Sequence, residues 1–245
     1  MKLDIVKGNI VAVAADAIVL PAKTTLKEGA GASRAIFIAA GRDELTKACK
    51  NIGFCKVGEA VPTPAYQLNA NCIVHAVVPK WVNGESGELE LLSTAYQSAL
   101  KVADMMEGCK SVAFPLLASG NNGFDAKIAF EIAVESIKSY EKTYEVKNLQ
   151  RVLLVVYSDS IASIVASQGY LFSEFPIKSV TTGKTAQEIN RGKTELEVIA
   201  REYWEGVCNR VLTYLGDPEN RERFLDVGEK AVKAVVAVAV AKAMH

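Results

Sequence analysis

Short apolar segments alternate along this chain with segments of helical periodicity, and this alternation limits the folds that the chain can adopt. We predict buried strands at 17–20, 72–78, 111–114 and 150–157, and a further strand at 3–6. Strands that are apolar along their whole length are typical of a sheet that is covered on both faces. The chain is therefore predicted to be α/β, with helices on both faces of a mixed sheet.

Helices are predicted between and after these strands, at 33–40, 43–50, 89–106, 126–140 and 160–168. Ser33 and Asp43 are the expected N-cap residues of the first two helices, because their side-chain oxygens can accept from backbone N–H groups. Glycine is common just past a helix end, so Gly41 is expected to end the first helix.

Prolines affect the predicted extent or position of two strands. Pro21 is expected to end the strand at 17–20. The segment 58–68 is predicted to be an edge strand or hairpin, because Pro62 and Pro64 cannot donate to a central ladder.

The composition favours a packed globular chain, since half of the 245 residues are hydrophobic and 23% are charged. Basic and acidic side chains balance at 28 each, so we expect no nucleic-acid partner. The two histidines are too few for a histidine-rich metal site. The five cysteines are odd in number and form no CxxC pair. We therefore expect no metal, cofactor or disulfide framework.

The N-terminal residues lack the apolar region of a secretory signal. The longest apolar stretch, at 234–241, is too short to cross a bilayer. We therefore expect a cytoplasmic protein without a membrane partner.

Two loops of small residues are the strongest functional signal. The segment 114–125, FPLLASGNNGFD, joins a predicted strand to a helix, and the loop 27–33 also leads into a helix. Free backbone N–H groups and the helix dipole favour anions at such places, although similar loops also serve as plain turns. Two such loops suit a diphosphate better than a single phosphate. Neither loop has the spacing of a Walker A loop or a dinucleotide fingerprint.

Six segments carry a family resemblance through their order, although none is specific alone. They are GNI at 8–10, DAIVLPAK at 16–23, GAGASRAIFIAAG at 29–41, GEAVPT at 58–63, IVHAVVPKW at 73–81 and AFPLLASGNNGF at 113–124. In this order they resemble the motifs of the macro domain, a module that binds ADP-ribose. The resemblance covers residues 1–171 and implies a three-layer, macro-domain-like fold for them.

The resemblance also implies a ligand site in which backbone amides of the two loops wrap a pyrophosphate. The implied ligand-binding residues are Asn9, Ile10, Lys23, Gly29, Ala30, Gly31, Ala32, Ser33, Ser119, Gly120, Asn121, Asn122, Gly123 and Phe124. Phe124 corresponds to the aromatic that borders the distal ribose; alternatively, it anchors its loop in the core.

Three of these positions depart from the family pattern. Asn9 replaces the aspartate that accepts from the adenine amino group, and its amide oxygen can still accept without charge assistance. Lys23 replaces an asparagine beside the distal ribose, so its ammonium lies near the ligand or points to solvent. Ser33 replaces an aspartate that often assists water in hydrolytic members, and serine alone is a poor general base. The catalytic residues of such a hydrolase are not identified by the resemblance; Ser33 and Lys23 are its candidates, and an N-cap role is the alternative for Ser33.

His75 lies within the apolar segment 72–78. We interpret it as a core histidine with satisfied hydrogen bonds, against the alternative of a catalytic group.

The C-terminal third does not resemble the macro domain. Residues 172–184 are predicted to be a linker, and 185–245 a helical extension or subdomain with an apolar stripe. This extension either packs on the first domain or forms a homodimer surface.

Three hypotheses for function follow. The first is a module that binds ADP-ribose, a related nucleotide diphosphate or an ADP-ribosylated protein. The second is a hydrolase that removes ADP-ribosyl groups or deacetylates O-acetyl-ADP-ribose, with non-standard catalytic residues. The third is a scaffold with a degenerate pocket that acts through its C-terminal helices.

Overall fold

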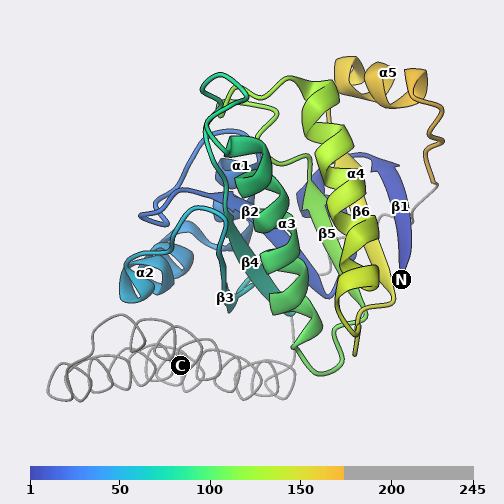
Figure 1. Ribbon diagram of the computed structural model, residues 1–245. Coiled ribbons are helices and arrows are strands. Elements are labelled where there is room, and N and C mark those ends of the chain that lie inside the picture. The colour runs from blue at the N-terminus through green and yellow to red at the C-terminus, as the bar shows by residue number, and fades with distance from the viewer. Residues whose placement is uncertain (174–245) are drawn as a thin grey trace, which may run out of the picture.

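The computed structural model describes residues 1–173, which form a six-stranded sheet with helices on both faces (Figure 1). The strands are β1 (Lys2–Lys7), β2 (Ala17–Ala22), β3 (Ala60–Pro64), β4 (Cys72–Val77), β5 (Ser111–Pro115) and β6 (Arg151–Val156). The helices are α1 (Ala32–Ala40), α2 (Arg42–Ile52), α3 (Glu88–Asp104), α4 (Ala126–Thr143) and α5 (Asp159–Ser167), and a 3₁₀ turn, η1, spans Ile10–Ala12. The predicted fold class is confirmed. The predicted helical extension and nearly all of the predicted linker lie outside the described residues.

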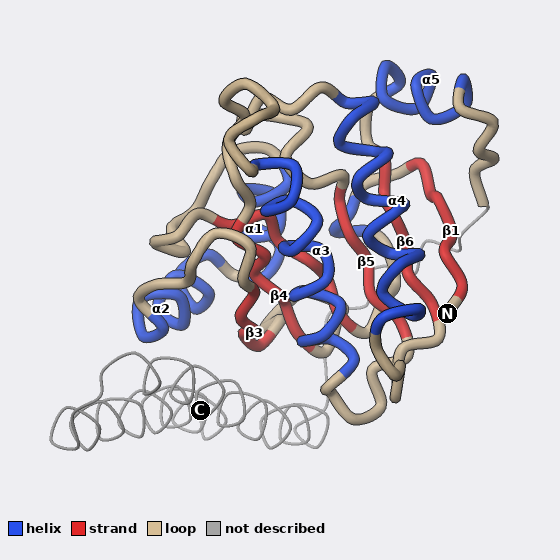
Figure 2. The backbone as a smooth tube through the Cα atoms, viewed as in Figure 1, coloured by secondary structure: helices blue, strands red, loops and turns tan. Residues whose placement is uncertain are grey.

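The strand order is β1-β6-β5-β2-β4-β3, and Figure 2 shows the strands side by side. Every pairing is parallel except that of β3 with β4, which is antiparallel. β3 carries Pro62 and Pro64 and lies at an edge, as predicted, because a proline there removes no ladder bond from a central position.

The expectation that Pro21 ends its strand is wrong, because β2 continues through Pro21 to Ala22. β4 pairs with the whole of β2, whereas β5 pairs with it only at Ala17 and Ile18. The Ala22 carbonyl accepts from the Val78 N–H on the β4 side. The missing N–H of the preceding residue, Pro21, therefore faces the side where β5 no longer pairs, and no ladder bond is lost.

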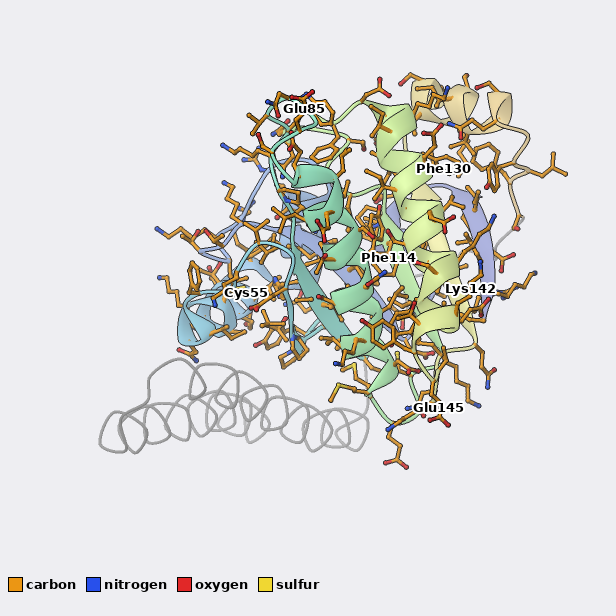
Figure 3. All side chains as sticks on the ribbon, in the orientation of Figure 1. Cys55, Glu85, Phe114, Phe130, Lys142 and Glu145 are labelled. Carbon is orange, nitrogen blue, oxygen red and sulfur yellow. The ribbon has the colours of Figure 1, made fainter. Side chains whose placement is uncertain are left out.

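Two apolar cores hold the three layers together. α3 and α4 cover one face of the sheet, and α1 and α2 cover the other. Figure 3 shows Phe114 of β5 beneath α3 and α4, where it packs against Tyr96 with ring centroids 5.3 Å apart. Alternate residues of each strand enter opposite cores; Val112 and Phe114 face α3 and α4, while Ala113 faces α1 and α2.

The expected N-caps of α1 and α2 are wrong. Gly31 and Gly41, with φ of +58° and +92°, precede the two helices, and neither helix has a side-chain cap. Ser33 and Asp43 instead lie within the first turns. Glycine adopts these positive φ values without steric cost, so the chain turns into each helix earlier than the side-chain pattern predicts. The predicted end of the first helix at Gly41 is confirmed.

The end of the described chain is fastened to the domain. The Tyr170 ring packs edge-on against Phe130 at 5.1 Å, and Phe172 packs on the core. The Ser173 N–H donates to the Ile5 carbonyl at 2.8 Å, and its hydroxyl donates to Asp4 at 3.0 Å. This segment therefore covers part of the open edge of β1. No helix in residues 1–173 is long and apolar enough to cross a membrane.

A buried tyrosine links α3 to the start of the loop after β5, and its removal gives the first prediction. The Tyr96 hydroxyl accepts from the Leu117 N–H at 3.0 Å, and both residues are fully buried. Tyr96→Phe leaves that N–H unpaired and should lower the free energy of unfolding by about 1–3 kcal/mol, measured by chemical denaturation. Tyr140→Phe is the matched control, since the Tyr140 hydroxyl has no hydrogen-bond partner within residues 1–173. Equal losses for the two variants would contradict the assignment.

Candidate functional site

The parallel strands bring their following loops to one edge of the sheet. Asn9 follows β1, residues 23–31 follow β2, residues 78–87 follow β4, residues 116–125 follow β5, and Tyr157 follows β6. The two predicted anion loops leave β2 and β5, which are neighbours in the sheet. Adjacent strands lie about 4.8 Å apart. The first requirement for a site that grips paired phosphates is therefore met.

The first loop is shaped by a hydrogen bond between two predicted site residues. The Gly29 N–H donates to the Ser33 hydroxyl at 3.0 Å, and Ser33 is only 2% exposed. Ala30 and Gly31 lie exposed at the end of the loop. Within residues 1–173, no protein acceptor is found for the N–H groups of Ala30 and Gly31, or for those of the first turn of α1. These donors and the helix dipole make the loop suited to an anion.

The second loop is held by a few bonds of its own. Ala118 has a φ of +63°, which is unusual for a residue with a side chain, and its carbonyl accepts from the Phe124 N–H at 3.3 Å. The Gly123 N–H donates to the Gly120 carbonyl at 2.9 Å. Among the described residues, no acceptor is found for the N–H groups of 119–122. The loop thus presents a second row of backbone donors.

Lys23 places an exposed cation beside the first loop. It is exposed directly after β2, and its Cε would lie 3.9 Å from a Cβ built on Gly29. Glu28 in the same loop accepts two hydrogen bonds from Arg42, at 2.7 and 3.0 Å, and lies 3.6 Å from Arg34. No ion pair involves Lys23 within residues 1–173. The carboxylate of the loop is therefore paired, whereas the lysine beside it has no acidic partner in the described chain.

Asn9 and Ile10 lie at the end of β1. The Asn9 side chain caps η1 by accepting from the Val11 N–H at 3.3 Å, and Ile10 is buried in the core. Tyr157, 78% exposed, follows the neighbouring strand β6, and the Gly8 N–H donates to the carbonyl of Val156 beside it. An exposed aromatic ring and an amide therefore flank the β1 end of the site. Sequence reasoning missed Tyr157, although an aromatic residue that ends an apolar strand was a visible signal.

Phe124 anchors its loop in the core. It is 4% exposed, and its ring packs edge-on against Trp81 with centroids 5.1 Å apart. This contact favours the anchor interpretation over a ring that borders a ligand. Asn122 also fixes this loop to the rest of the domain, since its side-chain amide donates to the Pro79 carbonyl at 2.7 Å.

Glu88 was missed by sequence reasoning, although it follows a short polar loop with two glycines. It begins α3, is 1% exposed, and accepts from the N–H groups of Val82, Asn83, Gly84 and Ser86 at 2.7–3.1 Å. The hydrogen bond from Gly84, helped by those from its neighbours, lowers the pKa of Glu88 from 4.5 to about 2 against the opposing effect of burial. Figure 3 shows this loop at the top of the molecule, where Glu85 is labelled.

His75 belongs to the core and not to the site. It is fully buried, with Nε2 2.8 Å from the Thr63 hydroxyl and Nδ1 4.0 Å from the Cys49 sulfur. Burial lowers the pKa of His75 to about 3 and raises the pKa of Cys49 to about 12, so both groups stay neutral at physiological pH. In residues 1–173, no cluster of three or more His, Cys, Asp or Glu side chains could hold a metal ion.

Comparison with known proteins agrees with this fold. The family model for the macro domain matches residues 19–133. A macro domain-containing protein of Chlorobaculum tepidum is 36% identical over 63% of this chain and 87% of its own length. An O-acetyl-ADP-ribose deacetylase of Salmonella gallinarum is 37% identical over 67% of this chain and 92% of its own length.

Solved structures extend the likeness to three dimensions. The Oceanobacillus iheyensis macrodomain with ADP is 30% identical, with a TM-score of 0.61 over 68% of this chain and 88% of that one. A mutant of the same macrodomain with ADPR has the same identity and TM-score, over 68% and 90%. The described residues thus form a mixed-sheet domain with two loops of small residues at one edge. The chain belongs to the macro domain family.

The lowered pKa of Glu88 gives a prediction for stability against pH. A carboxyl whose pKa is 4.5 when unfolded and about 2 when folded stabilises the fold fully above pH 4.5, and this contribution is lost as the pH falls toward 2. The difference in unfolding free energy between wild type and Glu88→Gln should therefore be constant above pH 4.5 and narrow below it. Denaturant titrations across this range measure it. Glu90→Gln is the control, since the Glu90 side chain makes no hydrogen bond within residues 1–173, and a difference that widens in acid would contradict the assignment.

Proposed function

We propose that this protein binds ADP-ribose, free or attached to a protein, through the two loops at the carboxyl edge of its sheet. The observation that carries the proposal is the pair of adjacent loops, each with backbone N–H groups that have no acceptor within residues 1–173. A diphosphate supplies acceptors for both rows, and the N-terminus of α1 favours its charge. The solved relatives with ADP and ADPR support the same class of ligand.

The base and the distal ribose of ADP-ribose have suitable partners at the ends of neighbouring strands. Asn9 and the exposed ring of Tyr157 lie together at the ends of β1 and β6, where an aromatic ring can stack on a base and an amide can hydrogen-bond to its edge. Lys23 lies at the end of β2, on the far side of β5 from this pair. We infer that the base lies toward Asn9 and Tyr157 and that the distal ribose lies toward Lys23.

The side chains of the site favour binding over hydrolysis. Ser33 is buried and its hydroxyl accepts from the Gly29 N–H, and no side chain within residues 1–173 accepts a hydrogen bond from that hydroxyl, so no base activates it. The carboxylates of the two loops after β2 and β5 are Glu28, which pairs with Arg42, and Asp125, which caps α4. Binding requires only the amides and the shape of the loops, so the hydrolase relatives do not change the proposal.

A charge placed on the second loop tests the proposal. A Cβ built on Gly120 has no atom within 4 Å, and Gly120 has no positive φ, so a side chain there enters open space without disturbing the fold. Gly120→Glu should weaken ADP-ribose binding by about 100-fold or abolish it, because its carboxylate would repel the pyrophosphate. Isothermal titration calorimetry with ADP-ribose measures the change.

Gly120→Gln is the matched control, because it adds the same bulk without the charge. Its loss of affinity should be much smaller than that of Gly120→Glu. Wild-type protein that gives no saturable heat at millimolar ADP-ribose would overturn the proposed function.

The orientation of the ligand gives a separate prediction. Tyr157→Ala should weaken ADP-ribose binding by about 10-fold, since the stacking of a base on an aromatic ring contributes roughly 1–3 kcal/mol. Binding of ribose 5-phosphate, which has no base, should not change. Tyr144→Ala removes another exposed tyrosine, located just after α4, and should leave both affinities as they are. Equal losses for the two ligands would contradict the placement of the base.

A further inference from the structure

We propose that Glu88 is a positioning residue for the second loop and that it acts through Trp81. This inference rests on the proposed function, because the second loop is one of the two that hold the pyrophosphate. Glu88 makes no hydrogen bond to residues 116–125, so its effect on the loop has to pass through an intermediate.

The first step is the turn that Glu88 organises. Its Oε1 accepts from Val82, Asn83 and Gly84, and its Oε2 accepts from Ser86. A single buried carboxylate thus gathers four backbone donors of the loop between β4 and α3. Hydrogen bonds to a charged acceptor are stronger than those between neutral groups, so the turn has one preferred shape.

The second step is the contact between this turn and the Trp81 ring. Gly84 makes the shortest bond to Glu88, at 2.7 Å, and has a φ of +85°. A Cβ built on Gly84 would lie 3.0 Å from Trp81 Cη2 and 3.4 Å from Cζ2. The ring therefore lies directly against Gly84, and a shift of the turn would displace the ring.

The third step joins Trp81 to the second loop. The backbone N–H of Trp81 donates to the Asn122 carbonyl at 2.8 Å, and the Trp81 ring packs edge-on against Phe124. A Cβ built on Gly123 would lie 3.6 Å from Trp81 Cβ. Trp81 thus contacts the three consecutive residues 122–124 at the end of the loop. Because the loop has few bonds of its own, these contacts fix where its amides point.

The experiment compares Glu88→Gln with Glu90→Gln, which removes the other carboxylate in the first turn of α3, two residues further on. Both are made with Trp204→Phe, so that Trp81 is the remaining tryptophan of the two in the chain. Three quantities are measured: amide hydrogen exchange of Gly123 and Phe124, the two hydrogen-bonded amides of the loop, without ligand; acrylamide quenching of Trp81; and the affinity for ADP-ribose. We expect Glu88→Gln to speed exchange and weaken affinity by about 10-fold each and to increase quenching, while Glu90→Gln matches the parent.

Each other outcome overturns the inference or separates it from the proposed function. Unchanged exchange of the Gly123 and Phe124 amides in Glu88→Gln overturns it, as does weaker binding with unchanged quenching of Trp81. If the parent protein does not bind ADP-ribose, the proposed function fails, but exchange and quenching still decide the positioning role.

A second pair of variants applies if Glu88→Gln does not fold. Trp81→Ala should speed exchange of the Gly123 and Phe124 amides, while Trp81→Phe, which keeps a ring beside Phe124, should restore most of their protection. Exchange in Trp81→Ala equal to that of wild type would overturn the inference.

Discussion

The parallel pairing of β2 with β4 and β5 is the constraint on which the site depends. Because these strands point the same way, the loops that follow them open at a single edge of the sheet. The pairing of Ile18 with Ala113 sets the two anion loops on adjacent strands. Each loop then leads into a helix that packs on the sheet, α1 on one face and α4 on the other. The C-terminal end of each loop is therefore anchored to a packed helix.

Much of this arrangement is visible in the sequence because it depends on local composition. The apolar strands at 17–20 and 72–78 and the proline-marked edge strand were predictable from a few residues each. Long-range pairing was not. Pro21 continues β2 because β5 has already stopped pairing there, and no pattern near Pro21 contains that information. The start of α1 likewise depends on the backbone of Gly31 and not on the hydroxyl of Ser33.

In the candidate site too, some features follow from local sequence and others only from long-range contacts. The small residues of the two loops and their anion chemistry follow from the sequence. The partners of Glu28, Phe124 and Trp81 do not, since Trp81 and Asn122 are brought together only by the fold. Glu88 has the same local appearance as Glu90, and only its burial against four amides distinguishes it. The roles proposed for single site residues remain predictions that ligand-bound measurements decide.

The loops of this site are held by groups that are not themselves anion donors. Ser33 holds Gly29, Tyr96 holds Leu117, and Trp81 holds Asn122. Because these three contacts come from three different helices or loops, we infer that the loop amides are already ordered in the ligand-free protein. Binding then requires little further loss of conformational entropy, which favours affinity.

The bond from Ser173 to Ile5 bears on how this protein can be shortened. β1 is an outer strand of the sheet, and outer strands with free backbone groups invite pairing with other chains. A chain that ended before Tyr170 would expose the outer edge of β1 and would also leave Asp4 without one of its hydrogen-bond donors. Such a fragment would keep the loops after β2 and β5 but expose backbone groups of β1 to pairing with other chains, so residue 173 is a better end for a shortened domain than any position before Tyr170.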